Sequence, residues 1–280
     1  PFALVSIHFF FVMELGVRGQ HVLVTGASGG IGLETARKFL KEGSFVTCHF
    51  QSNADALSGL IEEFPGSCWK VQANATVEAD VERALKEAVD KFGTVHTLVA
   101  NHAIFPPNSV SLKDMSLDQF KHTLDVNLNG IFLFTREWMR QLEVAMNKKE
   151  SLTNISCVLI GSTSGLFGEV GHVDYSCSKS ALTYGFCKTL KNELPLLVPN
   201  ARVNVVAPGW VKTPMAQKAI DEDPACIPKA LQTVALRKIA TPDDVANSIV
   251  FLASSAAGHV SGCILDVHGG MEGRCLNPLE

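Results

Sequence analysis

The stretch His21–Gly32, HVLVTGASGGIG, decides the fold of this chain. It begins as a short β-strand pattern, passes through a glycine-rich turn and opens an amphipathic helix. Glycines adopt backbone conformations closed to other residues and let a pyrophosphate approach the main chain. The free N–H groups and positive end of the following helix favour an anion there. Because the turn stands between a first strand and a helix, we expect it to bind a dinucleotide. The contacts expected from this turn are Gly26, Ser28, Gly29, Gly30 and Ile31.

The rest of the chain alternates short apolar runs with longer amphipathic stretches. The apolar runs predict strands over residues 21–25, 45–50, 67–72, 97–100, 155–160, 202–206 and 263–266. The amphipathic stretches predict helices over residues 31–41, 54–63, 77–92, 117–146, 175–194 and 242–254. Apolar strands separated by helices indicate a parallel sheet covered on both faces. We therefore predict an α/β fold, a doubly wound Rossmann-type sheet in a single domain over residues 16–280.

The amino terminus has a different character. Residues 1–12, PFALVSIHFFFV, are almost wholly apolar. A membrane-spanning helix needs about 20 apolar residues, and a signal peptide would show a basic start and a small-residue cleavage site. We therefore expect residues 1–15 to form an extension outside the fold and no membrane span, with a membrane-touching anchor as the alternative.

Composition narrows the partners. The formal net charge of -4 argues against a nucleic-acid surface, which needs a basic excess. The eight cysteines are scattered singly, several of them inside apolar runs. Such thiols indicate a reducing compartment, so we expect a cytoplasmic protein. The nine histidines show no metal-ligand spacing, and no metal site is expected.

The glycine spacing, T-G-x-x-x-G-x-G over residues 25–32, resembles that of the short-chain dehydrogenase/reductase family. The family's Ser-x(12)-Tyr-x-x-x-Lys array matches Ser162, Tyr175 and Lys179, and its active-site Asn matches Asn127. The resemblance extends over residues 19–271, closest in pattern to 3-oxoacyl-carrier-protein reductases. The family's Asn-Asn-Ala-Gly segment departs from the pattern here, because Ala100–Ala103 reads A-N-H-A.

The resemblance implies that Asn127, Ser162, Tyr175 and Lys179 are catalytic. Tyr175 and Lys179 are four residues apart on a predicted helix, so they share one face. A free tyrosine has a pKa near 10, and a nearby ammonium and the charge of an oxidised nicotinamide would lower it. Tyr175 would then act as acid and base, while Ser162 polarises a carbonyl oxygen. The resemblance further implies that Lys179 reaches the nicotinamide ribose and that Asn127 holds a water linked to Lys179.

The end of the second predicted strand bears on the choice of cofactor. It carries Phe50, Gln51, Ser52 and Asn53, with no carboxylate to repel a 2′-phosphate. This favours NADP(H) over NAD(H), although the Arg or Lys of many NADP-binding relatives is missing and Gly29 occupies one such position. The resemblance adds further cofactor contacts at Asn74, Ala75, Asn101, Tyr175, Lys179, Pro208, Gly209, Val211 and Thr213.

The segment after Pro208 is expected to cover the carbonyl site. Candidates to line it, for each of which core packing is an equal alternative, are Leu166, Phe167, His172, Trp210 and Met215. The expected substrate is a small-molecule ketone or secondary alcohol. By resemblance, the expected assembly is a homodimer or homotetramer.

The sequence offers three alternatives to a ketone/alcohol oxidoreductase. A catalytically silent dinucleotide-binding sensor or scaffold remains the alternative function. A Ser/His/Asp hydrolase built on His172 and Asp174 lacks a G-x-S-x-G nucleophile elbow. A sugar-nucleotide epimerase would need a larger carboxyl-terminal domain than the stretch after Pro208 provides.

Overall fold

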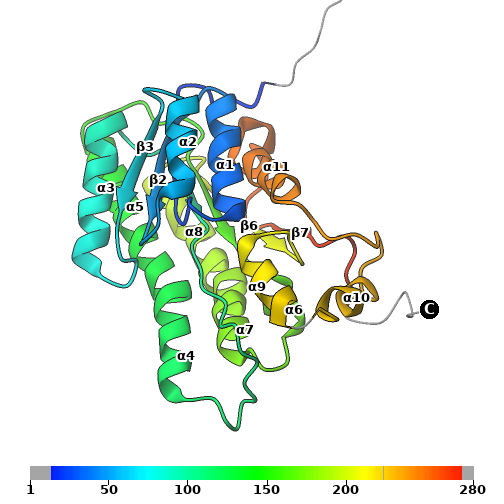
Figure 1. Ribbon diagram of the computed structural model, residues 1–280. Helices are drawn as coiled ribbons and strands as arrows, with labels where there is room; N and C mark the ends of the chain where they lie inside the picture. The colour runs from blue at the N-terminus through cyan, green and yellow to red at the C-terminus, as the bar shows by residue number, and fades with distance from the viewer. Residues whose placement is uncertain (1–13, 223, 273–280) are drawn as a thin grey trace, which may run out of the picture.

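The computed structural model describes residues 14–222 and 224–272. At its centre lies a seven-stranded parallel sheet in the order β3-β2-β1-β4-β5-β6-β7 (Figure 1). The strands are β1 (His21–Val24), β2 (Phe45–Phe50), β3 (Cys68–Gln72), β4 (Thr97–Ala100), β5 (Ser156–Ile160), β6 (Arg202–Pro208) and β7 (Ile264–Val267). The doubly wound parallel sheet predicted from the apolar runs is confirmed.

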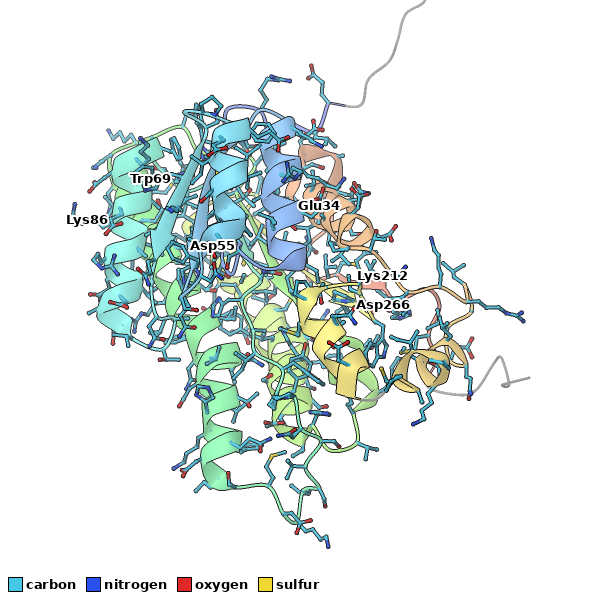
Figure 2. The ribbon with its side chains drawn as sticks, in the orientation of Figure 1. Glu34, Asp55, Trp69, Lys86, Lys212 and Asp266 are labelled. Atoms are coloured by element: carbon cyan, nitrogen blue, oxygen red, sulfur yellow. The ribbon has the colours of Figure 1, made fainter. Side chains whose placement is uncertain are left out.

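Helices cover both faces because buried strand residues alternate between them. In β1, Val22 and Val24 pack on one face and Leu23 on the other. The first face is covered by α1 (Gly30–Lys41), α2 (Asp55–Glu63) and α11 (Pro242–Ala253). The second is covered by α3 (Glu78–Phe92), α5 (Gly130–Asn147) and α8 (Cys187–Leu197). Charged side chains such as Asp55 and Lys86 are exposed on the outer sides of these helices (Figure 2).

Two of the predicted long helices are interrupted. The stretch predicted as one helix over residues 117–146 consists of α4 (Leu117–Leu124), a π-helical turn (Asp125–Asn129) and α5. The stretch predicted over residues 175–194 consists of α7 (Val173–Ser180), a second π-helical segment (Ala181–Phe186) and α8. π-helical turns are frequent at functional sites, and the first of these holds Asn127.

The strand order creates a crevice. The chain leaves β1 toward the β2 side of the sheet, and β4 lies on the opposite side of β1. Loops after neighbouring strands therefore diverge at the carboxyl ends of β1 and β4, which is where ligands bind in open α/β sheets. The shorter helices α6 (Thr163–Phe167), α9 (Pro214–Glu222) and α10 (Cys226–Leu231) follow β5 and β6.

The beginning of the described chain is attached to the fold. The carbonyl of Leu15 accepts hydrogen bonds from the backbone N–H (2.8 Å) and the hydroxyl (3.2 Å) of Ser255. Leu15, which we expected in the extension before the domain, thus contacts the fold, and residues 1–13 lie outside the described residues. Among the residues that the structure describes, no helix has the length and apolar character to cross a bilayer.

Candidate active site

A cavity of about 580 Å³ lies at the carboxyl ends of the strands. It extends from the glycine-rich turn after β1 to the segments that follow β5 and β6. Of the residues predicted from the sequence, it is lined by Gly26, Ser28, Gly29, Gly30, Ile31, Gln51, Ser52, Asn53, Ala75, Asn101, Ser162, Phe167, Tyr175, Lys179, Pro208, Gly209, Trp210, Val211, Thr213 and Met215. One space thus joins the two sets of residues that the sequence suggested separately.

The glycine-rich turn fits an anion at the start of α1. Gly26 has a φ of +64°, and a Cβ on Gly32 would lie 2.4 Å from the Gly26 carbonyl oxygen. The turn is held from β2, because the Gly26 N–H donates to His49 Nδ1 at 3.2 Å. No side chain caps the first turn of α1, whose Gly30 and Ile31 line the cavity. Uncapped N–H groups at the positive end of a helix suit the pyrophosphate of a dinucleotide.

His49 is a neutral acceptor in this arrangement. Burial lowers its pKa to about 4. Its Nε2 lies 3.1 Å from the carbonyl of Ala73, which requires the hydrogen on Nε2 and leaves Nδ1 free to accept from Gly26. The ring therefore links β2 to both the turn and the end of β3.

The residues that follow β2 are uncharged, as expected where the adenosine ribose of the cofactor would lie. Gln51, Ser52 and Asn53 all line the cavity. Phe50 does not, because its side chain is 9% exposed and packs in the core beneath α2. The prediction of a Phe50 contact with the cofactor therefore finds no support in the geometry.

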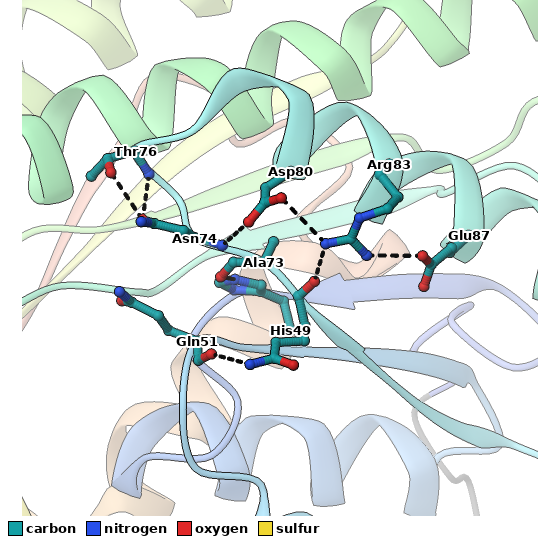
Figure 3. Close-up of polar contacts among 9 residues, drawn as sticks. His49, Gln51, Ala73, Asn74, Thr76, Asp80, Arg83 and Glu87 are labelled. Carbon is teal, nitrogen blue, oxygen red and sulfur yellow. Dashed lines mark hydrogen bonds and ion pairs between the residues drawn. The ribbon is translucent and has the colours of Figure 1, made fainter.

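Asn74 also lies outside the cavity lining, although its neighbour Ala75 is part of it. Its backbone N–H donates to Asp80 at 2.9 Å, and its side-chain oxygen accepts from the backbone and hydroxyl of Thr76 (Figure 3). The side-chain oxygen is thus engaged in the turn that starts α3, and the cofactor contact expected at Asn74 stays a prediction.

Asn101 joins the two sides of the crevice. Its Nδ2 donates to the carbonyls of Thr25 at 2.9 Å and of Gly26 at 3.2 Å. Its backbone N–H donates to Thr25 Oγ1 at 2.9 Å. The end of β4 therefore fixes the backbone of the glycine-rich turn, which gives Asn101 a structural role beside its place in the lining.

Tyr175, Ser162 and Lys179 meet at the other end of the cavity. Ser162 is the N-cap of α6, and its Oγ accepts the backbone N–H of Ser164 at 3.1 Å. Lys179 follows Tyr175 by one turn of α7, and its Nζ lies 5.7 Å from the centre of the tyrosine ring. The same Nζ donates to the carbonyl of Ile160 at 2.8 Å. That bond attaches α7 to the carboxyl end of β5.

Burial changes the pKa values of Tyr175 and Lys179 in opposite directions. It raises the pKa of Tyr175 to about 12, an effect opposed by the Ser162 hydroxyl and reinforced by the charge of Glu169. Burial also lowers the pKa of Lys179 to about 8. The phenol therefore holds its proton at neutral pH, and the ammonium is close to losing one.

Asn127 lies outside the cavity and connects the segments that form its wall. Its side chain is buried and does not line the cavity. Oδ1 accepts the backbone N–H of Ile104 at 2.8 Å, and Nδ2 donates to the Ile104 carbonyl at 2.9 Å and to Ser178 Oγ at 3.2 Å. These bonds connect the loop after β4, the π-helical turn and α7.

The substrate candidates divide into two groups. Phe167, Trp210 and Met215 line the cavity, whereas Leu166 and His172 do not. The His172 ring stacks on Phe105 with 4.3 Å between centroids, and Phe105 in turn meets Tyr175 edge to face at 4.9 Å. His172 therefore contacts the site only through a lining residue.

Several lining residues were not predicted from the sequence, among them His49, His102, Phe105 and Glu169. His49 could have been found, since it lies in the last residues of β2 beside Gln51. Phe105 follows β4 at the switch point, where a loop residue was to be expected. Glu169 stands between Ser162 and Tyr175 in the sequence, and a segment joining two site residues has to pass close to the site.

Comparisons with known proteins agree with this geometry. The sequence model of the family described as Enoyl-(Acyl carrier protein) reductase matches residues 26–272. The 3-oxoacyl-[acyl-carrier-protein] reductase of Thermotoga maritima is 32% identical over 257 residues, which are 91% of this chain and 98% of that protein. The enzyme of the same name from Aquifex aeolicus is 32% identical over 262 residues, 92% of this chain and 100% of its own.

A solved structure is similar as well. The crystal structure of the short-chain dehydrogenase/reductase SDR:Glucose/ribitol dehydrogenase from Brucella melitensis superposes with a TM-score of 0.81 at 25% identity, covering 93% of this chain and 99% of that one. The fold and cavity define a nicotinamide-dependent oxidoreductase that interconverts a ketone and a secondary alcohol. The chain belongs to the short-chain dehydrogenase/reductase family.

The glycine-rich turn yields a test of dinucleotide binding. In Gly32→Ala the new Cβ would lie 2.4 Å from the Gly26 oxygen and 2.7 Å from Asn101 Nδ2, so the turn must shift. Losing one charge-assisted hydrogen bond to the pyrophosphate weakens NADPH binding by about tenfold to a hundredfold. Titration of NADPH fluorescence measures the dissociation constant.

The matched control is Gly29→Ala, whose Cβ would meet only the Gly26 oxygen, at 3.8 Å. We expect this variant to bind NADPH within a few-fold of the wild type. Unchanged affinity in a folded Gly32→Ala protein would contradict the placement of the pyrophosphate.

Proposed function

We propose that this chain uses NADP(H) to interconvert a medium-sized ketone and its secondary alcohol, with Tyr175 as the acid and base. The observation that carries the proposal is that Tyr175, Ser162 and Lys179 line the same cavity as the glycine-rich turn. A catalytically silent dinucleotide-binding protein would not require these three side chains at one end of it.

Ser162, Tyr175 and Lys179 each have a separate role in the proposed reaction. The dinucleotide, when bound, supplies or accepts the hydride. Ser162 Oγ donates a hydrogen bond to the carbonyl oxygen and polarises it. Tyr175, whose pKa is raised to about 12, keeps its proton at neutral pH and donates it to the oxygen that becomes the alcohol. In the oxidative direction the Lys179 ammonium stabilises the phenolate that accepts the proton.

The support for Asn127 is more indirect. Its amide fixes Ile104, a lining residue, and contacts Ser178 beside Lys179. We propose that it keeps the loop after β4 and the helix of Tyr175 and Lys179 at a fixed separation, and that it anchors the water that carries protons to Lys179.

The apolar residues that line the cavity and the names of the similar proteins indicate the class of substrate. Phe105, Phe167, Trp210, Met215 and Met271 give the carbonyl end an apolar lining. Such a lining suits an acyl chain or a ring next to the ketone. The relatives from Thermotoga maritima and Aquifex aeolicus are named as 3-oxoacyl-[acyl-carrier-protein] reductases, so a 3-oxoacyl thioester belongs in the substrate panel.

Assembly and location rest on the family relationship. We infer a homodimer or homotetramer, the arrangement implied by the resemblance. Cys48, Cys68, Cys157 and Cys187 are buried thiols, which supports a cytoplasmic protein.

Tyr175→Phe tests the chemistry. It removes the acidic proton while keeping the ring, so turnover of ketone and NADPH should fall by about 10²- to 10⁴-fold. The dissociation constant of NADPH should stay within a few-fold. Turnover is followed by the absorbance of the reduced nicotinamide. The matched control is Tyr184→Phe, because Tyr184 is the other tyrosine of the chain and lies half-exposed outside the cavity lining. Wild-type turnover in Tyr175→Phe would rule out the mechanism.

Gln51→Asp tests the choice of cofactor. The wild type should use NADPH with a higher kcat/KM than NADH, because Gln51, Ser52 and Asn53 present no carboxylate to the 2′-phosphate. A carboxylate at position 51 repels the phosphate and should lower kcat/KM for NADPH by about tenfold or more. Gln51→Asn controls for the shape change. The proposal fails if the wild type prefers NADH.

The pH profile tests Lys179. Because burial lowers its pKa from 10.5 to about 8, the ammonium is present below that pH and is lost as the pH rises through it. The kcat/KM for NADPH reports the free enzyme, so it should fall about tenfold per pH unit above about 8. Lys179→Arg keeps a permanent cation and should move the fall to higher pH. A wild-type profile flat from pH 7 to about 10 would contradict a role for the ammonium.

A further inference from the structure

Glu169 is the one carboxylate among the described residues that line the cavity. It lies after α6, in the segment between Ser162 and Tyr175, and its side chain is half-buried. The chain turns toward it at Gly168, whose φ of +74° ends α6. The carboxylate therefore stands at the carbonyl end of the cavity and not at the cofactor's adenosine end.

The carboxylate is held next to the reacting groups. Ser164 Oγ donates a hydrogen bond to Glu169 Oε2, and the Ser164 N–H donates to Ser162 Oγ. Two hydrogen bonds thus connect Glu169 to the serine that faces the carbonyl. The charge of Glu169 also raises the pKa of Tyr175, which shows that its field reaches the phenol.

Among the described lining residues, no cation pairs with the Glu169 carboxylate. Lys179 is the only other charged residue of the described lining, and its Nζ donates to the Ile160 carbonyl. The remaining walls here are apolar, with Phe167 and Trp210 among them. Water is partly excluded by such walls, so a charge on the substrate would interact with Glu169 more strongly than in bulk solvent.

We propose that Glu169 determines specificity by admitting ketones that carry a hydrogen-bond donor or a positive charge near the carbonyl and by rejecting keto acids. A hydroxyl or ammonium of the substrate donates to the carboxylate, whereas a substrate carboxylate is repelled by it. This inference rests on the proposed function and names the substrate class of the same site.

The test uses three ketones of one skeleton: 4-oxopentanoate, its methyl ester and (4-oxopentyl)trimethylammonium. With NADPH, the wild type should reduce the cation with a kcat/KM above that of the anion by on the order of tenfold to a hundredfold. Glu169→Gln keeps the size of the side chain and removes the charge, so this ratio should fall toward one. The ester should change least. A wild-type ratio of one or below, or a ratio that Glu169→Gln leaves intact, overturns the proposal.

Two controls separate charge from structure. Glu62→Gln removes one negative charge from an exposed position on α2 outside the cavity lining and should keep the wild-type ratio. Glu169→Asp keeps the charge and should retain most of the selectivity. Equal losses in all three variants would show a non-specific effect of net charge and overturn the assignment.

Binding measurements keep the inference distinct from the proposed function. Calorimetry on the protein loaded with NADP+, which has no hydride to transfer to a ketone, gives the dissociation constants of the cation and the anion without turnover. Charge-selective binding with no reduction of any ketone would uphold the role of Glu169 and contradict the oxidoreductase proposal. Reduction of the ester without charge selectivity would do the reverse.

Discussion

The hydrogen bond from Lys179 Nζ to the carbonyl of Ile160, 2.8 Å long, is the constraint on which the site depends. A buried ammonium is costly to desolvate, and its lowered pKa expresses that cost. The carbonyl at the end of β5 partly offsets it, and in doing so fixes the distance between the sheet and α7. Because Tyr175 is one turn away on α7, the same bond sets where the phenol stands relative to Ser162, which lies two residues after the end of β5.

Other buried contacts hold α7 from the side away from the sheet. The carboxylate of Asp174 is fully buried and accepts from Thr123 Oγ1 at 2.8 Å and Gln119 Nε2 at 3.2 Å, both on α4. Asn127 connects to the same helix through Ser178. The helix that carries Tyr175 and Lys179 is thus attached to β5, to α4 and to the π-helical turn, and little freedom remains for Tyr175 except at its side chain. Such support is what holds a reacting group in a productive geometry.

The sequence predicts the sheet and the meeting of the motifs for a common reason. Apolar strand runs and a glycine-rich turn are local signals, and parallel strands bring their carboxyl ends to one edge, so Gly26, Ser162 and Pro208 have to converge.

The features that the sequence does not predict are ones that local patterns do not contain. A π-helical turn such as Asp125–Asn129 adds a residue to one turn of the helix, and over so few positions the spacing of apolar residues does not distinguish it from an α-helical turn. Phe50 lies at the end of its strand as predicted, but its side chain points into the core, whereas His49 before it and Gln51 after it line the cavity. Loop residues such as Phe105 and Glu169 turn toward the site because of their neighbours, which spacing alone does not reveal.

The electrostatics of the site favour one protonation state of the tyrosine. Burial and the charge of Glu169 both stabilise the neutral phenol, and only the Ser162 hydroxyl opposes them in the protein itself. The cation that would favour the phenolate, Lys179, has its own pKa lowered to about 8. Without the positive charge of an oxidised nicotinamide, the side chains therefore hold Tyr175 as a neutral phenol, which is the form that the proposed reduction of a ketone requires. Oxidation of an alcohol demands the opposite state, and the additional positive charge needed to reach it comes from the oxidised cofactor, so the proton affinity of Tyr175 and the redox state of the dinucleotide are coupled through the same cavity.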